Sequence, residues 1–269
     1  MGLVEAADGI RLHTQDLGTG AAVVLLAGFG LTHELWDRQV RVLTGSGHRV
    51  ICIDQRGHGM SDAPLDGYEV DQLVADLRAV LDRMGIESCT LVGHSFGGQV
   101  AFGLAATATD IVDRLVLVGS NGVGASRTER FPFGRPAERL IQPMIDSEIR
   151  DRLGSRTAAI ASGFGSAPDQ RTVEWLLRSS LQMPSWAAVA CYRSMFEADL
   201  VDAVPAVSVP VLQIIGEDDP VHSAKGARWL SERLANSRLV TLPACGHYPM
   251  LESPDAFESA LLAFLREAR

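Results

Sequence analysis

Short apolar runs recur along the chain, and most of them are rich in β-branched residues. Their length and the turn residues around them are typical of strands buried on both faces of a sheet. Two further segments, residues 3–6 and 10–17, flank Asp8-Gly9, a turn signal that predicts an antiparallel hairpin at a sheet edge. Together they predict a sheet of about eight strands. The apolar runs span residues 22–26, 49–53, 89–92, 115–119, 209–216 and 238–243.

Amphipathic helices are predicted between these strands. Trp36, Val40 and Leu43 recur at helical spacing, and a second apolar stripe runs from Leu73 to Met84. A repeated order of strand, helix and strand is typical of a mostly parallel, doubly wound sheet. The predicted fold class is therefore α/β.

The strand pattern is interrupted once, over residues 122–204. A segment of this length exceeds an ordinary loop, and its residues 131–200 show helical patterns with many aromatic and Met side chains. We expect an α/β core formed by residues 1–121 and 205–269, and an inserted helical cap formed by residues 122–204. The cap would wall a pocket over the sheet.

One glycine-rich turn stands between a predicted strand and a predicted helix. It reads Gly93-His94-Ser95-Phe96-Gly97 and precedes the small-residue stretch 98–106. A chain that reverses in so few residues forces Ser95 to a positive φ, and the flanking glycines remove Cβ atoms that would collide. Such a turn presents the serine hydroxyl above the sheet at a helix N-terminus. Ser95 is therefore the candidate nucleophile, and a structural glycine turn is the alternative.

A serine nucleophile needs a base, and the base needs an acid that orients it. Both are expected just after strands, because binding groups collect at the carboxyl ends of parallel strands. Of the seven histidines, His247 follows the last strand and is preferred as the base. His94 lies on the turn itself, and its side chain is expected to point away from the Ser95 hydroxyl.

The acid is expected in the loop after the strand at residues 209–216. Asp219 stands directly before Pro220, which favours an extended backbone there, and it is preferred over Asp218. Asn121 ends the preceding strand, but an amide cannot supply the negative charge.

An oxyanion formed at Ser95 would need two N–H donors. We expect the backbone N–H of Phe96 and that of Phe29, which lies in the glycine-rich loop after residues 22–26. A merely flexible turn is the alternative interpretation of that loop. The rings of Phe29 and Phe96 are expected to line the acyl side of the pocket. The further residues expected to contact substrate are Gly28, Asn121, Trp186, Phe196 and Tyr248.

The composition of the chain mainly excludes classes of partner. The chain of 269 residues carries a formal net charge of −9 and has a pI near 5.2, which disfavours nucleic acid and anionic membranes as partners. A small-molecule substrate is the expected partner, and a homodimer stays open. Neither a signal-peptide pattern nor an apolar run of about 18 residues is present, so a cytoplasmic location is expected. No disulfide, metal or cofactor is expected from the spacing of Cys52, Cys89, Cys191 and Cys245.

From about residue 10 to its C-terminus the chain resembles the α/β-hydrolase family, most weakly in the cap. Besides the Ser95 turn, the order Ser95, Asp219, His247 matches that family. The family usually has His-Gly at the oxyanion loop, whereas this chain has Ala27 in place of that histidine. Three further motifs carry the resemblance: Asp54-x-Arg56-Gly57-x-Gly59-x-Ser61, Gly216-Glu217-x-Asp219-Pro220 and Gly246-His247-x-Pro249-x-x-Glu252-x-Pro254.

The resemblance, closest to the serine esterase and enol-lactonase branch, implies cofactor-free hydrolysis of a small, largely apolar ester, lactone or thioester through an acyl-enzyme. Ser95 argues against dehalogenases and epoxide hydrolases, whose nucleophile is Asp. His94 and Tyr248 differ from the Asn and Trp usual in ring-cleavage carbon–carbon hydrolases. Two alternatives stay open: a cofactor-free cyclase, lyase or carbon–carbon hydrolase on the same fold, and a ligand receptor. Such a lyase would tolerate loss of Ser95, and a receptor would bind ligand tightly with very slow turnover.

Overall fold

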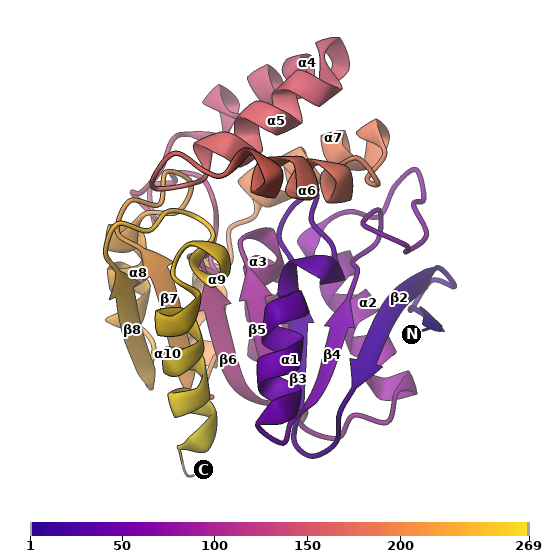
Figure 1. Ribbon diagram of the computed structural model, residues 1–269, viewed down its shortest axis with the longest axis vertical. Coiled ribbons are helices and arrows are strands. Elements are labelled where there is room, and N and C mark those ends of the chain that lie inside the picture. The colour runs from indigo at the N-terminus through magenta and orange to yellow at the C-terminus, as the bar shows by residue number, and fades with distance from the viewer. Residues whose placement is uncertain (1, 268–269) are drawn as a thin grey trace.

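The computed structural model describes residues 2–267, and a single eight-stranded sheet forms its centre (Figure 1). The spatial order of the strands is β1-β2-β4-β3-β5-β6-β7-β8. This confirms the predicted α/β fold class and the predicted number of strands. The strands are β1 (Gly2–Glu5), β2 (Arg11–Leu17), β3 (Ala22–Leu26), β4 (Arg49–Ile53), β5 (Cys89–His94), β6 (Val112–Val118), β7 (Val211–Gly216) and β8 (Ser237–Leu242).

The sheet is antiparallel at one edge and parallel elsewhere. β1 and β2 form the predicted hairpin, and β2 also runs antiparallel to β4. All pairings from β4 to β8 are parallel. β3 lies between β4 and β5: the connection from β3 to β4 runs to one side, and the connection from β4 to β5 crosses back to the other. The crevice above such a switch point is where open α/β sheets bind ligands.

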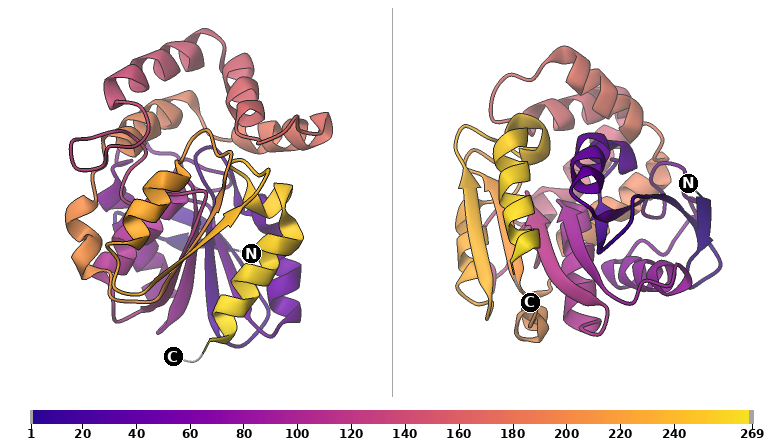
Figure 2. Two further views of the ribbon diagram at one scale, coloured as in Figure 1. Left: turned by 90° about the vertical axis from the view of Figure 1, so that its left-hand side faces the viewer. Right: turned by 60° about the horizontal axis from the view of Figure 1, so that its bottom comes forward.

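Helices cover both faces of the sheet (Figures 1 and 2). Val23 and Leu25 of β3 pack into the core on one face, whereas Val24 and Leu26 pack into the core on the other. Because both faces are buried, the strand is continuously apolar rather than alternating. One face carries α1 (Asp37–Gly45) and α10 (Pro254–Arg266), and the other carries α2 (Val70–Arg83), α3 (Phe96–Thr107) and α8 (Ala224–Ser231).

β6 begins at Val112, earlier than the apolar run at residues 115–119 indicated. Its first residues include the polar Asp113 and Arg114. Val112 and Arg114 pair with Cys89 and Thr90 of β5, and the register shifts between these two pairs. Strand pairing needs backbone hydrogen bonds rather than apolar side chains, so the apolar pattern underestimates this strand.

Four helices lie above the carboxyl ends of the parallel strands, at the top of Figure 1. They belong to the segment in which the strand pattern was absent. Among residues 2–267 there is no helix with both the length and the apolar character needed to cross a membrane. The four helices are α4 (Ile141–Arg150), α5 (Arg152–Ser162), α6 (Gln170–Ser180) and α7 (Ser185–Glu197); the short elements are η1 (His33–Trp36), η2 (Ala137–Arg139), η3 (Val201–Ala206) and α9 (Pro249–Glu252).

Candidate active site

Ser95 occupies a sharp turn between β5 and α3. Its backbone has φ 52° and ψ −120°, a left-handed conformation that residues with a side chain rarely adopt. A Cβ on Gly93 would lie 2.4 Å from the carbonyl oxygen of Gly97, and a Cβ on Gly97 would lie 2.5 Å from that of Ala27. The expected collision across the turn is therefore confirmed for Gly93, whereas Gly97 avoids a collision with the chain at the end of β3.

Asp219 and His247 meet beside this turn, although 28 residues separate them in the chain. Nδ1 of His247 lies 3.0 Å from Oδ2 of Asp219, whose side chain is fully buried. The other carboxylate oxygen accepts hydrogen bonds from the backbone N–H groups of Val221 and His222, at 2.8 and 2.9 Å. Burial alone would raise the pKa of Asp219, but the charge and hydrogen bond of His247, with help from His222, outweigh burial and lower it. Asp218, the other candidate acid, is exposed.

A cavity of about 120 Å³ opens over Ser95 and His247. Core loops form its floor, and helices α4 to α7 form its roof. Within residues 2–267 the Ser95 hydroxyl makes no hydrogen bond. A nucleophile often approaches its base closely only when substrate binds, and the Ser95 hydroxyl is available for that contact with His247. The roof residues include Met144, Arg156, Ile160, Ser180, Tyr192 and Phe196.

Two backbone N–H groups beside Ser95 have no hydrogen-bond partner within the described chain. They belong to Phe29 and Phe96, the residues expected to bind an oxyanion. Unpaired N–H groups are rare in protein interiors, so a free pair beside a strained serine is chemically significant. The ring of Phe96, however, is fully buried in the core, so only the ring of Phe29 lines the cavity as expected.

The other residues expected to contact substrate divide into two groups. Phe196 and Tyr248 line the cavity, and Gly28 packs directly on Ser95, where a Cβ would lie 2.8 Å from Cβ of that serine. Trp186 and Asn121 lie outside the cavity lining, contrary to expectation. Trp186 is 49% exposed, because its side of α7 faces away from the cavity. Its indole N–H donates a hydrogen bond to the backbone oxygen of Pro64. Asn121 is buried and donates its backbone N–H to His222 Nδ1 at 3.4 Å.

Two histidines that sequence reasoning passed over surround His247. His94 lines the cavity, and its Nε2–H donates a hydrogen bond to the backbone oxygen of His247 at 2.9 Å. The ring of His222 stacks on that of His247, with centroids 5.7 Å apart. Burial is the main cause that lowers the pKa of His94 to about 3 and that of His222 to about 4. Both rings are therefore neutral near pH 7. The only sequence signal was their position, one residue before Ser95 and three after Asp219.

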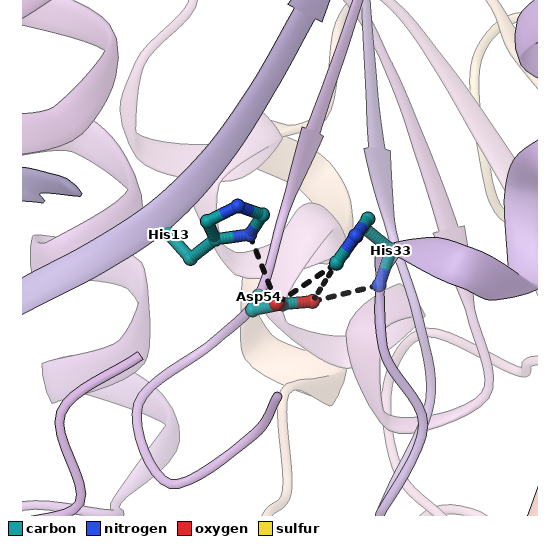
Figure 3. Close-up of side chains that lie close together, drawn as sticks. All are labelled: His13, His33 and Asp54. Atoms are coloured by element: carbon teal, nitrogen blue, oxygen red, sulfur yellow. Dashed lines mark hydrogen bonds and ion pairs between the residues drawn. The ribbon is translucent and has the colours of Figure 1, made fainter. Parts of the chain in front are cut away.

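A buried cluster anchors the loop that carries Phe29 (Figure 3). Asp54 accepts the backbone N–H of His33 at 2.7 Å and is reached by Nδ1 of His33 at 2.9 Å and by Nδ1 of His13 at 3.1 Å. Hydrogen bonding to Asp54 is the main cause that raises the pKa of His33. In residues 2–267 this is the one group of three close potential metal ligands. Because the backbone of Met60 also donates to Asp54, the carboxylate is already saturated and serves as a structural anchor.

The fold and the site now define the class of protein. Residues 21–254 match the family described as alpha/beta hydrolase fold, so the chain belongs to this family of hydrolases. The similar proteins assign it to the esterase and enol-lactonase-like branch, as the resemblance implied.

Three comparisons illustrate the similarity. The pimeloyl-(acyl-carrier protein) methyl ester esterase of Nitrosomonas europaea is 33% identical over 92% of this chain and 97% of its own length. A non-heme chloroperoxidase of Streptomyces lividans is 30% identical over 99% of this chain and 100% of its own. The solved esterase EaEST of Exiguobacterium antarcticum superposes with a TM-score of 0.96 at 26% identity, covering 99% of this chain and 100% of its own.

Proposed function

We propose that the protein hydrolyses a small, largely apolar carboxylic ester, lactone or thioester through an acyl-enzyme on Ser95. The observation that carries the proposal is that the strained Ser95 and the Asp219-bonded His247 open into one cavity. The similarity to a methyl ester esterase and to a solved esterase supports the choice of an ester bond.

In the proposed mechanism, Oγ of Ser95 attacks the carbonyl carbon while Nε2 of His247 takes its proton. Asp219 holds Nδ1–H of the base and stabilises the imidazolium that forms. The oxyanion accepts hydrogen bonds from the free backbone N–H groups of Phe29 and Phe96. The alcohol or thiol leaves with the proton from His247, and water activated by the same histidine then releases the acid. Because the pKa values of His94 and His222 are lowered, neither ring competes with His247 for the proton taken from Ser95.

A fluorophosphonate probe tests the activated serine. Intact mass and peptide mapping should show one adduct on Ser95 in the wild type, and no adduct in Ser95→Ala or His247→Ala. Ser179→Ala is the matched control, because this buried serine bonds to Thr32 and lies outside the cavity lining. A burst of p-nitrophenol from a p-nitrophenyl ester would report the acyl-enzyme. Absence of labelling in folded protein would favour the lyase or receptor alternatives.

A second candidate is peracid formation, which the similarity to a bifunctional esterase/perhydrolase of Acinetobacter calcoaceticus favours. Hydrogen peroxide would replace water as the nucleophile that attacks the acyl-enzyme, releasing a peracid and regenerating the Ser95 hydroxyl. Peracid produced from an acetate ester and hydrogen peroxide should then be lost in Ser95→Ala. An unchanged yield in that variant would exclude this route.

A further inference from the structure

Two hydroxyl groups in the cavity are left unsatisfied by the protein. Tyr192 on α7 is 1% exposed and Ser180 at the end of α6 is 4% exposed, and both line the cavity. Within residues 2–267 neither hydroxyl makes a hydrogen bond. Buried polar groups nearly always have a partner, because leaving one unpaired is costly. A substrate that fills this cavity must therefore bring a polar atom or leave both hydroxyls unpaired.

The two hydroxyl-bearing residues flank the same loop. The ring of Phe29 stacks on the ring of Tyr192, with centroids 4.5 Å apart and planes inclined by 27°. The next residue, Gly30, faces Ser180, since a Cβ placed on it would lie 2.9 Å from the serine Oγ. Both hydroxyls are thus on the wall next to the proposed oxyanion donor, Phe29.

The nearby cation is not free to bind a substrate carboxylate. Arg156 lines the cavity, but its guanidinium forms a buried two-point ion pair with Glu148, at 2.7 and 3.1 Å. It also donates to the backbone oxygens of Ser180 and Met183. A carboxylate entering this wall would meet the two hydroxyls but no unpaired cation, so it would lose its hydration without a compensating charge, which is unfavourable.

A neutral oxygen meets no such penalty. Burial raises the pKa of Tyr192, so its hydroxyl stays protonated and can donate a hydrogen bond. Arg152, a second cation 3.7 Å from Glu148, is 36% exposed and therefore screened by solvent. The wall consequently favours an uncharged hydrogen-bond acceptor.

We propose that Tyr192 and Ser180 form a polar subsite that selects substrates with a second, neutral oxygen, such as a ketone, ether or hydroxyl oxygen. This inference rests on the proposed hydrolase function and narrows its substrate class from apolar esters to oxygenated esters or lactones. The subsite orients substrate through hydrogen bonds, and it takes no part in bond breaking.

Matched esters test the subsite. On the acyl side, p-nitrophenyl pentanoate is compared with the 3-methoxypropanoate, the 4-oxopentanoate and the mono-ester of glutaric acid. On the alcohol side, butyl acetate is compared with 2-methoxyethyl acetate, which replaces one CH₂ by oxygen. Each kcat/KM is divided by the rate of alkaline hydrolysis. In at least one series we expect about a tenfold preference for the neutral oxygenated member, and no preference for the charged glutarate.

Removing one hydroxyl should reverse this preference. Tyr192→Phe keeps the stacking on Phe29, so we expect about a tenfold loss on the oxygenated ester and a gain on the apolar one. Ser180→Ala should shift the ratio in the same direction. Tyr68→Phe and Ser179→Ala are matched controls, because these hydroxyls already bond to Pro64 O and to Thr32 and lie outside the cavity lining. Both controls should keep the wild-type ratio.

The outcomes separate the subsite from the chemistry. Equal rates within both ester series, a preference for the glutarate ester, or an unchanged ratio in Tyr192→Phe would each overturn the subsite while ester hydrolysis persists. If no ester is cleaved and the fluorophosphonate leaves Ser95 unlabelled, the proposed function itself fails and takes this inference with it.

Discussion

The strain at Ser95 can be measured with two variants that are equally unable to form an acyl-enzyme. Ser95→Ala keeps a Cβ at φ 52° and ψ −120°, whereas Ser95→Gly removes it. A residue with a side chain in such a region costs about 1–3 kcal/mol. Glycine offsets this gain by about 0.5–1 kcal/mol, because the unfolded chain has more conformational entropy with glycine than with alanine. The midpoints of these two ranges differ by about 1 kcal/mol, and we expect Ser95→Gly to be more stable than Ser95→Ala by about that amount.

Urea unfolding of the two variants measures this difference directly, and the melting temperature should differ by about 2–4 °C per kcal/mol for a chain of this size. The same exchange at Ser179 is the control. That serine lies in α6 with a negative φ, so alanine should there be more stable than glycine by about 0.5–1 kcal/mol. If alanine equals or exceeds glycine at position 95, the turn is unstrained and the proposed reason for its glycine-flanked geometry is wrong.

Three further predictions follow from the site. Ester hydrolysis should increase with pH, because a general base acts only in its unprotonated form, and a flat profile from about pH 5 to 8 would contradict the role proposed for His247. Because the pKa of His222 is lowered from 6.5 to about 4, the unfolded chain takes up the proton first. The contribution of His222 to the free energy of unfolding should thus be fully present above about pH 6.5 and decrease toward pH 4. Urea unfolding of His222→Gln should show a weaker dependence of stability on pH, and the same dependence as in the wild type would refute this prediction. Glu148→Leu should lower the free energy of unfolding by about 3–5 kcal/mol, because it leaves the buried Arg156 without its ionic partner. The double variant Glu148→Leu, Arg156→Met should recover much of this loss. If it recovers none, the loss comes from packing and not from the unpaired charge.

Most of the fold could be predicted because its causes are local. Runs such as residues 22–26 are apolar at every position since both faces of β3 are buried, and Asp8-Gly9 specifies a hairpin by turn chemistry. The need for Gly93 is equally local, because its Cβ would meet Gly97 across the turn, whereas Gly97 is needed because the end of β3 and the loop after it pack against it. The start of β6 was harder to predict, since Asp113 and Arg114 are polar and the register of its pairing with β5 shifts there.

The candidate site was predictable where it follows the strand order. His247 and Asp219 stand just after β8 and β7, and parallel strands bring their carboxyl ends to one edge, so chain order alone indicated that they meet near Ser95. The same reasoning could not place His94 or His222, because the direction of a side chain on a loop depends on what packs against it.

By itself, then, the sequence determined the sheet, the strained turn at Ser95 and the elements that carry its neighbours, all of which depend on local sterics and strand order. Only the tertiary structure decided which side of each cap helix faces the cavity. Trp186 and Tyr192 lie on the same helix with similar apolar character, yet one donates to Pro64 at the surface and the other lines the cavity. That choice depends on how α7 docks over the core, through contacts between residues far apart in the chain, and no local pattern encodes it.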